Sequence, residues 1–201
     1  MLRAFLASEI TTEYGAAADE LSAWWGTAEG SEGDDLLVTG GYDRLARAAA
    51  DALDVRLSSP VERIDWGGDG VSVHVGDGRL DADHVIVTVP LGVLQSGAIT
   101  FDPPLPAAVS GSIERLGMGL LDKYWFRWDE QFWPDDALMW TRVAPADAPF
   151  SEWYNLAPVT GAPVLLALLG GPQARKWEGR SDDEVESTAR AALEDIGGQL
   201  G

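Results

Sequence analysis

The stretch that decides the fold is HVIVTVPLGVLQSGAITFDPPLPAAVSGSIERLGMGLLDKYWFRWDEQFWP, which runs from His84 to Pro134. Its first six residues, His84–Val89, are mainly apolar and β-branched, which predicts a strand buried on both faces. Pro90 ends this strand, because proline has no N–H to donate to a sheet ladder. The stretch is therefore expected to open with a buried strand.

A helix and a second strand are predicted further along the same stretch. Val109, Ile113 and Leu116 recur at the spacing of one buried helical face. Gly117 is a residue type that commonly ends a helix. A second strand is predicted over Leu120–Trp128.

Lys123 is the unusual residue of this second strand. Side chains alternate across a strand, so Lys123 shares a face with Leu121 and Trp125. From the pattern alone, Lys123 can be a surface or edge-strand lysine whose stem lies along the aromatic side chains. It can also be a functional amine held between apolar neighbours and partly shielded from water.

Alternating patterns predict further strands on both sides of this stretch. Before it, three short runs joined by Gly/Asp turns predict a meander, over 61–66, 71–75 and 79–82. After it, strands are predicted over 137–143, 151–156 and 164–169. Ser181 and Glu184 form a capping box that starts a final helix.

Four blocks of the chain resemble the flavin-containing amine oxidases, a family that includes polyamine oxidases, monoamine oxidases and flavin-dependent histone demethylases. The blocks are TVPLGVL at 88–94, ITFDPPLP at 99–106, RLGMGLLDKYWFRW at 115–128 and FWP at 132–134. Several separated blocks in the same order are more specific than any single short motif. The resemblance implies an α/β fold, with α+β character in the substrate part. It implies a partial FAD-binding region at 34–95 and a mixed-sheet substrate-binding region at 1–33 and 96–201.

The resemblance also implies a chemistry and its residues. The family oxidises an amine to an imine with FAD, and O₂ is reduced to H₂O₂; the TVPLGVL block looks closest to polyamine oxidases, so a polyamine-like amine is the expected substrate. Lys123 matches the lysine that holds a water against the flavin, and is the expected catalytic residue. Val61, Thr88, Val89 and Pro90 match cofactor-binding positions, and Tyr154 matches an aromatic position of the amine pocket. Cation–π attraction gives an aromatic wall a reason to hold an amine.

Composition excludes several other classes of function. The chain has 14 Lys+Arg against 33 Asp+Glu, a formal charge of −19, which repels phosphate backbones, so nucleic acid is not an expected partner. There is no cysteine. His74 and His84 have no further ligand-type residues at metal-binding spacing, so no metal site is expected.

The chain is expected to be a soluble interior piece of a longer oxidase. Its longest C-terminal aliphatic run, Val164–Leu169, is too short to cross a bilayer. No secretory signal is evident, which favours the cytoplasm.

Gly117–Asp122 (GMGLLD) nearly matches the dinucleotide-binding motif G-x-G-x-x-G. Its last residue is Asp, however, and it precedes a strand, whereas the motif follows one. Without that turn, the isolated chain is expected to hold FAD weakly.

Two alternatives to an active amine oxidase stay open. The chain can be a non-catalytic remnant or binding module on the same scaffold, which the missing pyrophosphate-binding turn would favour. It can also belong to a desaturase or protoporphyrinogen-oxidase-like flavoenzyme, an alternative that Lys123 argues against. The oligomeric state does not follow from the sequence.

Overall fold

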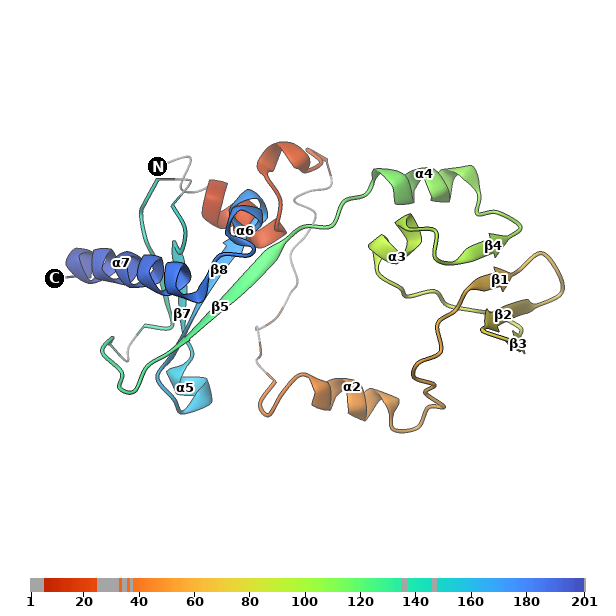
Figure 1. Cartoon of the computed structure of the whole chain (residues 1–201), viewed down its shortest axis with the longest axis horizontal. Coiled ribbons are helices and arrows are strands. Elements are labelled where there is room, and N and C mark those ends of the chain that lie inside the picture. The colour runs from red at the N-terminus through yellow and green to blue at the C-terminus, as the bar shows by residue number, and fades with distance from the viewer. Residues whose placement is uncertain are drawn as a thin grey trace. The chain divides into compact units, whose positions relative to one another are not determined.

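A computed structural model describes residues 6–24, 33, 36, 38–134, 137–145 and 148–200. The chain divides into two compact units, one made of Met1–Thr39 with Gly119–Gly201 and the other of Gly40–Met118 (Figure 1). Helices and sheets occur in both units, which confirms the predicted mixed α/β class. The predicted assignment of 34–95 to the cofactor and of the remainder to the substrate concerns ligands, and stays a prediction.

The 40–118 unit contains a four-stranded sheet in the order β3-β2-β1-β4. Its strands are β1 (Arg63–Asp65), β2 (Val71–Val75), β3 (Gly78–Ala82) and β4 (Thr100–Asp102). The first three pair antiparallel, as the predicted meander requires, and β4 adds parallel to β1. The sheet is therefore mixed.

Three helices complete this unit: α2 (Asp43–Ala50), α3 (Leu91–Gln95) and α4 (Ala107–Arg115). The Gln95 side-chain amide donates hydrogen bonds of 2.9 Å to the main-chain oxygens of both Ile113 and Leu116. These two hydrogen bonds connect the C-terminal end of α3 to the C-terminal end of α4. Gly40 and Gly41, just before α2, have φ of +82° and +103°, a conformation that favours glycine.

The predicted strand at His84–Val89 is wrong. This segment has no regular secondary structure, and five of its six residues are exposed; Ile86 is 87% exposed. Within the described parts of the chain, no main-chain hydrogen bond reaches the segment. A β-branched run favours extended backbone, but a strand also needs a neighbour to pair with its N–H and C=O groups. The sequence pattern reports the first condition and not the second.

The other unit is built on a four-stranded antiparallel sheet in the order β5-β8-β7-β6 (Figure 1). Its strands are β5 (Leu121–Arg127), β6 (Met139–Thr141), β7 (Glu152–Asn155) and β8 (Val164–Gly170). β5, β7 and β8 each coincide with a predicted strand to within one residue, and β6 is shorter than its predicted segment by two residues at each end. The longest pairing, β5 with β8, matches Leu121 with Gly170 and Arg127 with Val164.

Helical segments surround this sheet: η1 (Leu6–Thr12, a π-helix), η2 (Ala18–Glu20, a 3₁₀-helix), α5 (Ala157–Thr160), α6 (Gly171–Trp177) and α7 (Asp182–Leu200). The predicted capping box starts α7. The Glu184 N–H donates to the Ser181 hydroxyl at 3.3 Å, and the Ser181 N–H donates to the Glu184 carboxylate at 3.4 Å.

The core of this unit lies between one face of the sheet and α7. Phe150, Trp153 and Leu165 are fully buried, and Ala189, Ala192 and Ile196 of α7 pack into the same cluster. The Phe150 ring lies 5.2 Å from the Tyr124 ring and 5.3 Å from the Trp177 ring, centroid to centroid. Aromatic pairs at such separations add to the free energy gained from burial alone. This face of the sheet is therefore filled.

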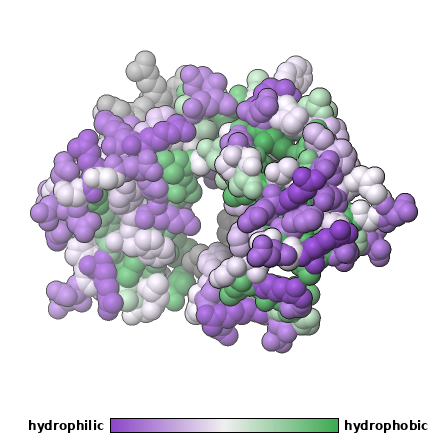
Figure 2. Space-filling view, turned by 45° about the vertical axis from the view of Figure 1, so that its right-hand side comes forward, coloured by the Kyte–Doolittle hydropathy of each residue, from purple (hydrophilic) through white to green (hydrophobic). Residues whose placement is uncertain are grey.

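The surface carries apolar side chains among hydrophilic ones, as Figure 2 shows for one face of the molecule. Trp125 is 61% exposed, Leu57 is 84% exposed and Met118 is 67% exposed.

No helix within the described residues is long and apolar enough to cross a bilayer.

Candidate active-site residues

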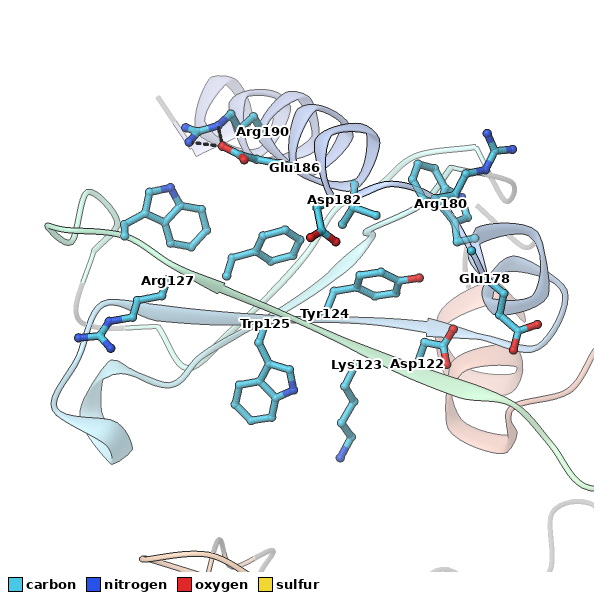
Figure 3. Close-up of a pocket in the computed structure, with 15 residues that line it drawn as sticks. Asp122, Lys123, Tyr124, Trp125, Arg127, Glu178, Arg180, Asp182, Glu186 and Arg190 are labelled. Atoms are coloured by element: carbon cyan, nitrogen blue, oxygen red, sulfur yellow. Dashed lines mark hydrogen bonds and ion pairs between the residues drawn. The ribbon is translucent and has the colours of Figure 1, made fainter.

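Strand β5 has two faces of different character. Tyr124 and Phe126 point into the core, and packing partners from α7 and the 150–153 segment hold them there. Leu121, Lys123, Trp125 and Arg127 alternate with them and are exposed. Figure 3 shows Lys123 and Trp125 on one side of β5 and Tyr124 on the other. Lys123 therefore shares a face with Leu121 and Trp125, as the alternation predicts.

Lys123 is exposed, so the shielding from water that we expected for this amine is not present among the described residues. Leu121 is 41% and Trp125 61% exposed, which leaves the ammonium group open between them. β5 is also an edge strand of the four-stranded sheet. The amine can therefore be approached from outside the sheet.

The sheet register places Tyr154 on the same face as Lys123. Residues directly opposite each other on paired strands share a face. Trp125 lies opposite Leu166, and Leu166 lies opposite Tyr154. β5 and β7 are two strand spacings apart, about 10 Å. The structure thus brings the expected catalytic and substrate-binding residues onto one surface.

The register adds a residue that the sequence analysis missed, Glu152. Lys123 lies opposite Leu168, and Leu168 lies opposite Glu152, so the three form one cross-strand row. Glu152 is only 7% exposed. Its position in SEWYNL looks unremarkable in sequence, because only the pairing of β7 with β8 shows that it shares a face with Lys123.

The four expected cofactor-binding residues all lie in the 40–118 unit. Val61 lies two residues before β1. The next residue, Glu62, donates its N–H to the His74 carbonyl of β2 at 3.0 Å. Thr88, Val89 and Pro90 end the extended segment that leads into α3, and the Pro90 carbonyl accepts from the Val93 N–H at 2.9 Å. The structure does not join Val61 to this segment through any hydrogen bond between described residues.

The cofactor-binding role of these four residues stays a prediction. The main-chain groups of Thr88 and Val89 have no hydrogen-bonding partner within the described parts of the chain, so they are available to a ligand. At the Gly40-Gly41 turn, a Cβ on Gly40 would lie 2.8 Å from the Arg44 guanidinium, and one on Gly41 would lie 2.6 Å from the Asp43 carboxylate.

His74 has a structural partner. Its Nε2 lies 2.8 Å from Asp65 Oδ2, and the Arg63 Nε donates to Asp65 Oδ1 at 2.6 Å. The hydrogen bond from His74, followed by those from Arg63, lowers the pKa of Asp65. Arg63 also pairs with Asp102 of β4. The described residues contain no group of three or more metal-ligating side chains.

The model of the family described as flavin containing amine oxidoreductase matches residues 15–200. This chain belongs to that family. The match covers both units and all six expected site residues. It confirms the resemblance that the four sequence blocks indicated.

Curated relatives include a lysine-specific histone demethylase 1 homolog 1 and a polyamine oxidase 4, both of Oryza sativa subsp. japonica. The first is 37% identical over 180 residues, 86% of this chain and 21% of the relative. The second is 36% identical over 174 residues, 86% of this chain and 36% of the relative. This member of the family thus spans between about a fifth and about a third of these relatives.

Solved structures of putrescine oxidase have a similar fold. The wild-type enzyme bound to putrescine aligns with a TM-score of 0.65 at 25% identity, and the alignment covers 78% of this chain and 35% of that one. A double mutant from a redesign of that enzyme's cofactor binding aligns with a TM-score of 0.64 at 26% identity and the same coverage. The family membership implies a flavin as the cofactor.

Proposed function

We propose that this chain is the substrate-binding and part of the cofactor-binding region of an FAD-dependent amine oxidase that acts on a polyamine-like substrate. The observation that supports the proposal most is the common sheet face of Lys123 and Tyr154, in a chain of the amine oxidoreductase family. When bound, FAD would accept a hydride equivalent from the carbon beside the amine nitrogen, and O₂ would take up the two electrons and two protons as H₂O₂.

The chain's own residues would bind and orient the reactants. Tyr154 would present an aromatic wall to the substrate ammonium. Lys123 would hold a water molecule and exchange protons with it while the imine product is hydrolysed to an aldehyde and an amine. Glu152, in the same row as Lys123, would favour a cationic substrate over a neutral one. Val61 and the 88–90 segment would contact FAD through main-chain groups and apolar side chains.

A second candidate is oxidative demethylation of a methylated lysine side chain. The demethylase homolog of rice favours it, since its identity to this chain is close to that of the rice polyamine oxidase. Oxidation of the N-methyl carbon followed by hydrolysis would release formaldehyde and the unmethylated lysine.

The test is a substrate comparison with the protein expressed from its full reading frame. Putrescine, spermidine, spermine and a dimethyl-lysine peptide are supplied under air, and peroxide, formaldehyde and flavin absorbance are measured. Peroxide from the polyamines without formaldehyde supports the proposed oxidase. Formaldehyde from the peptide alone selects the demethylase. Bound flavin with no peroxide from any of these amines contradicts both.

A further inference from the structure

A groove runs along the open edge of β5, on the 1–39 and 119–201 unit. It has a volume of about 800 Å³ and is lined by residues 122–128 of β5 and its end, by Trp177 at the end of α6 and the 178–180 segment after it, and by the first turns of α7 (Figure 3). Tyr124, Phe126 and Trp177 give it apolar walls. Because it follows seven consecutive residues along the strand, it has the length of an extended peptide segment rather than of a small ligand.

The main chain of β5 offers free hydrogen-bonding groups to this groove. At one end of the strand the Gly171 N–H donates to the Leu120 carbonyl at 2.8 Å, and at the other end the Trp128 N–H donates to the Pro163 carbonyl at 3.0 Å. Bonded pairs alternate along an antiparallel ladder, so the even-numbered residues of β5 bond to β8. The N–H and C=O groups of Lys123 and Trp125 therefore point to the open edge. No described strand pairs with that edge.

The groove is acidic on the α7 side. Its two arginines there are already neutralised: Arg180 lies 3.1 Å from Glu184, and Arg190 lies 2.7 Å from Glu186. Three further carboxylates, Asp122, Glu178 and Asp182, have no salt bridge to any described residue. Figure 3 shows Asp122 and Glu178 on the side to which the Tyr124 hydroxyl points, and Asp182 between α7 and β5.

The Tyr124 hydroxyl lies near carboxylate groups that affect its pKa. Burial, and then the charges of Asp122 and Glu178, raise the pKa of Tyr124 above its ordinary value. A negative field at this point of the groove attracts cations. The opposite face of β5 carries Lys123 and Arg127, which repel them. A strand added to β5 would therefore meet negative charge on one face and positive charge on the other.

We propose that the open edge of β5 binds an extended peptide segment as an additional antiparallel strand, with basic side chains at every second position. All three strand pairs of this sheet are antiparallel, which favours the same direction for the new strand. The basic side chains would lie over Asp122, Glu178 and Asp182. Small neutral residues would alternate with them, beside Lys123 and Arg127. Peptides commonly bind exposed sheet edges in this way. A second copy of the chain suits the groove less well, because two chains of net charge −19 repel each other.

The antiparallel geometry predicts which peptide amides matter. A residue hydrogen-bonded to Lys123 has its side chain on the Lys123 face, because bonded residues opposite each other share a face. In a peptide of alternating Lys and Thr, those residues are the threonines. N-methylation of the threonine amides should therefore block binding, and N-methylation of the lysine amides should not.

The experiment measures binding of a fluorescent, end-blocked Lys-Thr octapeptide to the 201-residue chain at low salt. We expect saturable binding, at least tenfold weaker after methylation of the threonine amides and unchanged after methylation of the lysine amides. Equal affinity of the two methylated peptides overturns strand addition, and weaker binding of the lysine-methylated peptide overturns the antiparallel direction. Spermine that binds as tightly as the unmethylated peptide would reduce the groove to a simple cation site and so overturn the proposal.

Charge variants complete the test. Asp122→Asn and Glu178→Gln should each weaken peptide binding about threefold, the size typical of one exposed ion pair. Asp129→Asn is the matched control, because Asp129 lies after β5 and outside the groove lining. A loss with Asp129→Asn equal to that with Asp122→Asn, or a dimer that dissociates when the peptide is added, contradicts the proposed occupant.

Discussion

Lys123 and Glu152 occupy one cross-strand row of the β5-β8-β7-β6 sheet, on either side of Leu168. The Lys123 side chain is exposed and Glu152 is 7% exposed, so one face of the sheet carries both a reachable amine and a buried carboxyl group. The pairing arises because the segment from Glu152 to Asn155 joins β8 in antiparallel register. Two stretches almost thirty residues apart in sequence thereby supply one candidate site.

Replacing Lys123 with Met should lower amine oxidation by the full-length protein about a hundredfold, the lower range for a group that assists proton transfer. Stability should change by less than about 0.5 kcal/mol, because the side chain is exposed. Steady-state peroxide production measures the first effect and urea denaturation the second. Arg127→Met, on the same strand and face, is the control. An equal loss of activity in both variants would show that the lysine has no special role.

Replacing Glu152 with Gln should raise KM for a cationic amine several-fold and leave kcat nearly unchanged. The carboxylate is proposed to attract the substrate before reaction, and loss of one partly shielded charge pair costs about 1 kcal/mol. Kinetics with putrescine at two salt concentrations measure it, and Glu130→Gln, in the loop after β5, is the control. A fall in kcat with KM unchanged would assign Glu152 to the chemical step instead.

Replacing Trp153 with Ala should destabilise the sheet-containing unit by about 3–5 kcal/mol, because the indole is fully buried. Its Nε1 also donates to the Phe150 carbonyl at 2.9 Å, and this bond would be lost. Trp125→Ala removes the same side chain from the exposed face and should cost less than about 1 kcal/mol. Urea midpoints compare the two variants. Similar midpoints would place the core elsewhere than between the sheet and α7.

The sequence predicted local structure well, because short-range rules determined it. The Gly/Asp turns gave the meander, and Ser181 with Glu184 gave the start of α7. Alternation gave the face of Lys123. These features depend on residues within a few positions of one another, so their signals are present in the sequence itself.

Features that depend on pairing partners were not predictable. His84–Val89 has the composition of a buried strand, yet no described segment pairs with it. Glu152 joined the candidate site, and Tyr154 came onto the face of Lys123, only through the register of β7, β8 and β5. The exposure of Lys123 followed from its place on an edge strand, and the order of strands in a sheet leaves no local signal. Long-range pairing therefore decided what the pattern alone left open.

Acid should weaken the 40–118 sheet through Asp65. Hydrogen bonds from His74 and then Arg63 lower the pKa of Asp65 in the folded chain. A lowered pKa stabilises the fold fully above the unfolded value of about 4, and this stabilisation disappears as the pH falls through the lowered value. Thermal unfolding followed from about pH 7 to about pH 2 should show a steeper acid loss in the wild type than in Asp65→Asn. Asp69→Asn, in an exposed turn of the same sheet, should retain the wild-type slope, and parallel curves for all three proteins would contradict the assignment.

Replacing Ser181 with Ala should destabilise α7 by about 1 kcal/mol, the usual cost of losing an N-cap. The Ser181 hydroxyl accepts from the Glu184 N–H, and the Ser181 N–H and the Arg180 guanidinium hold the pKa of Glu184 below its ordinary value. Because α7 supplies Ala189, Ala192 and Ile196 to the core, the loss should appear in the urea midpoint of the whole unit. Ser187→Ala is the control, since Ser187 lies inside the helix, where alanine has the higher propensity. The cap has no energetic role if Ser181→Ala unfolds at the same urea concentration as Ser187→Ala.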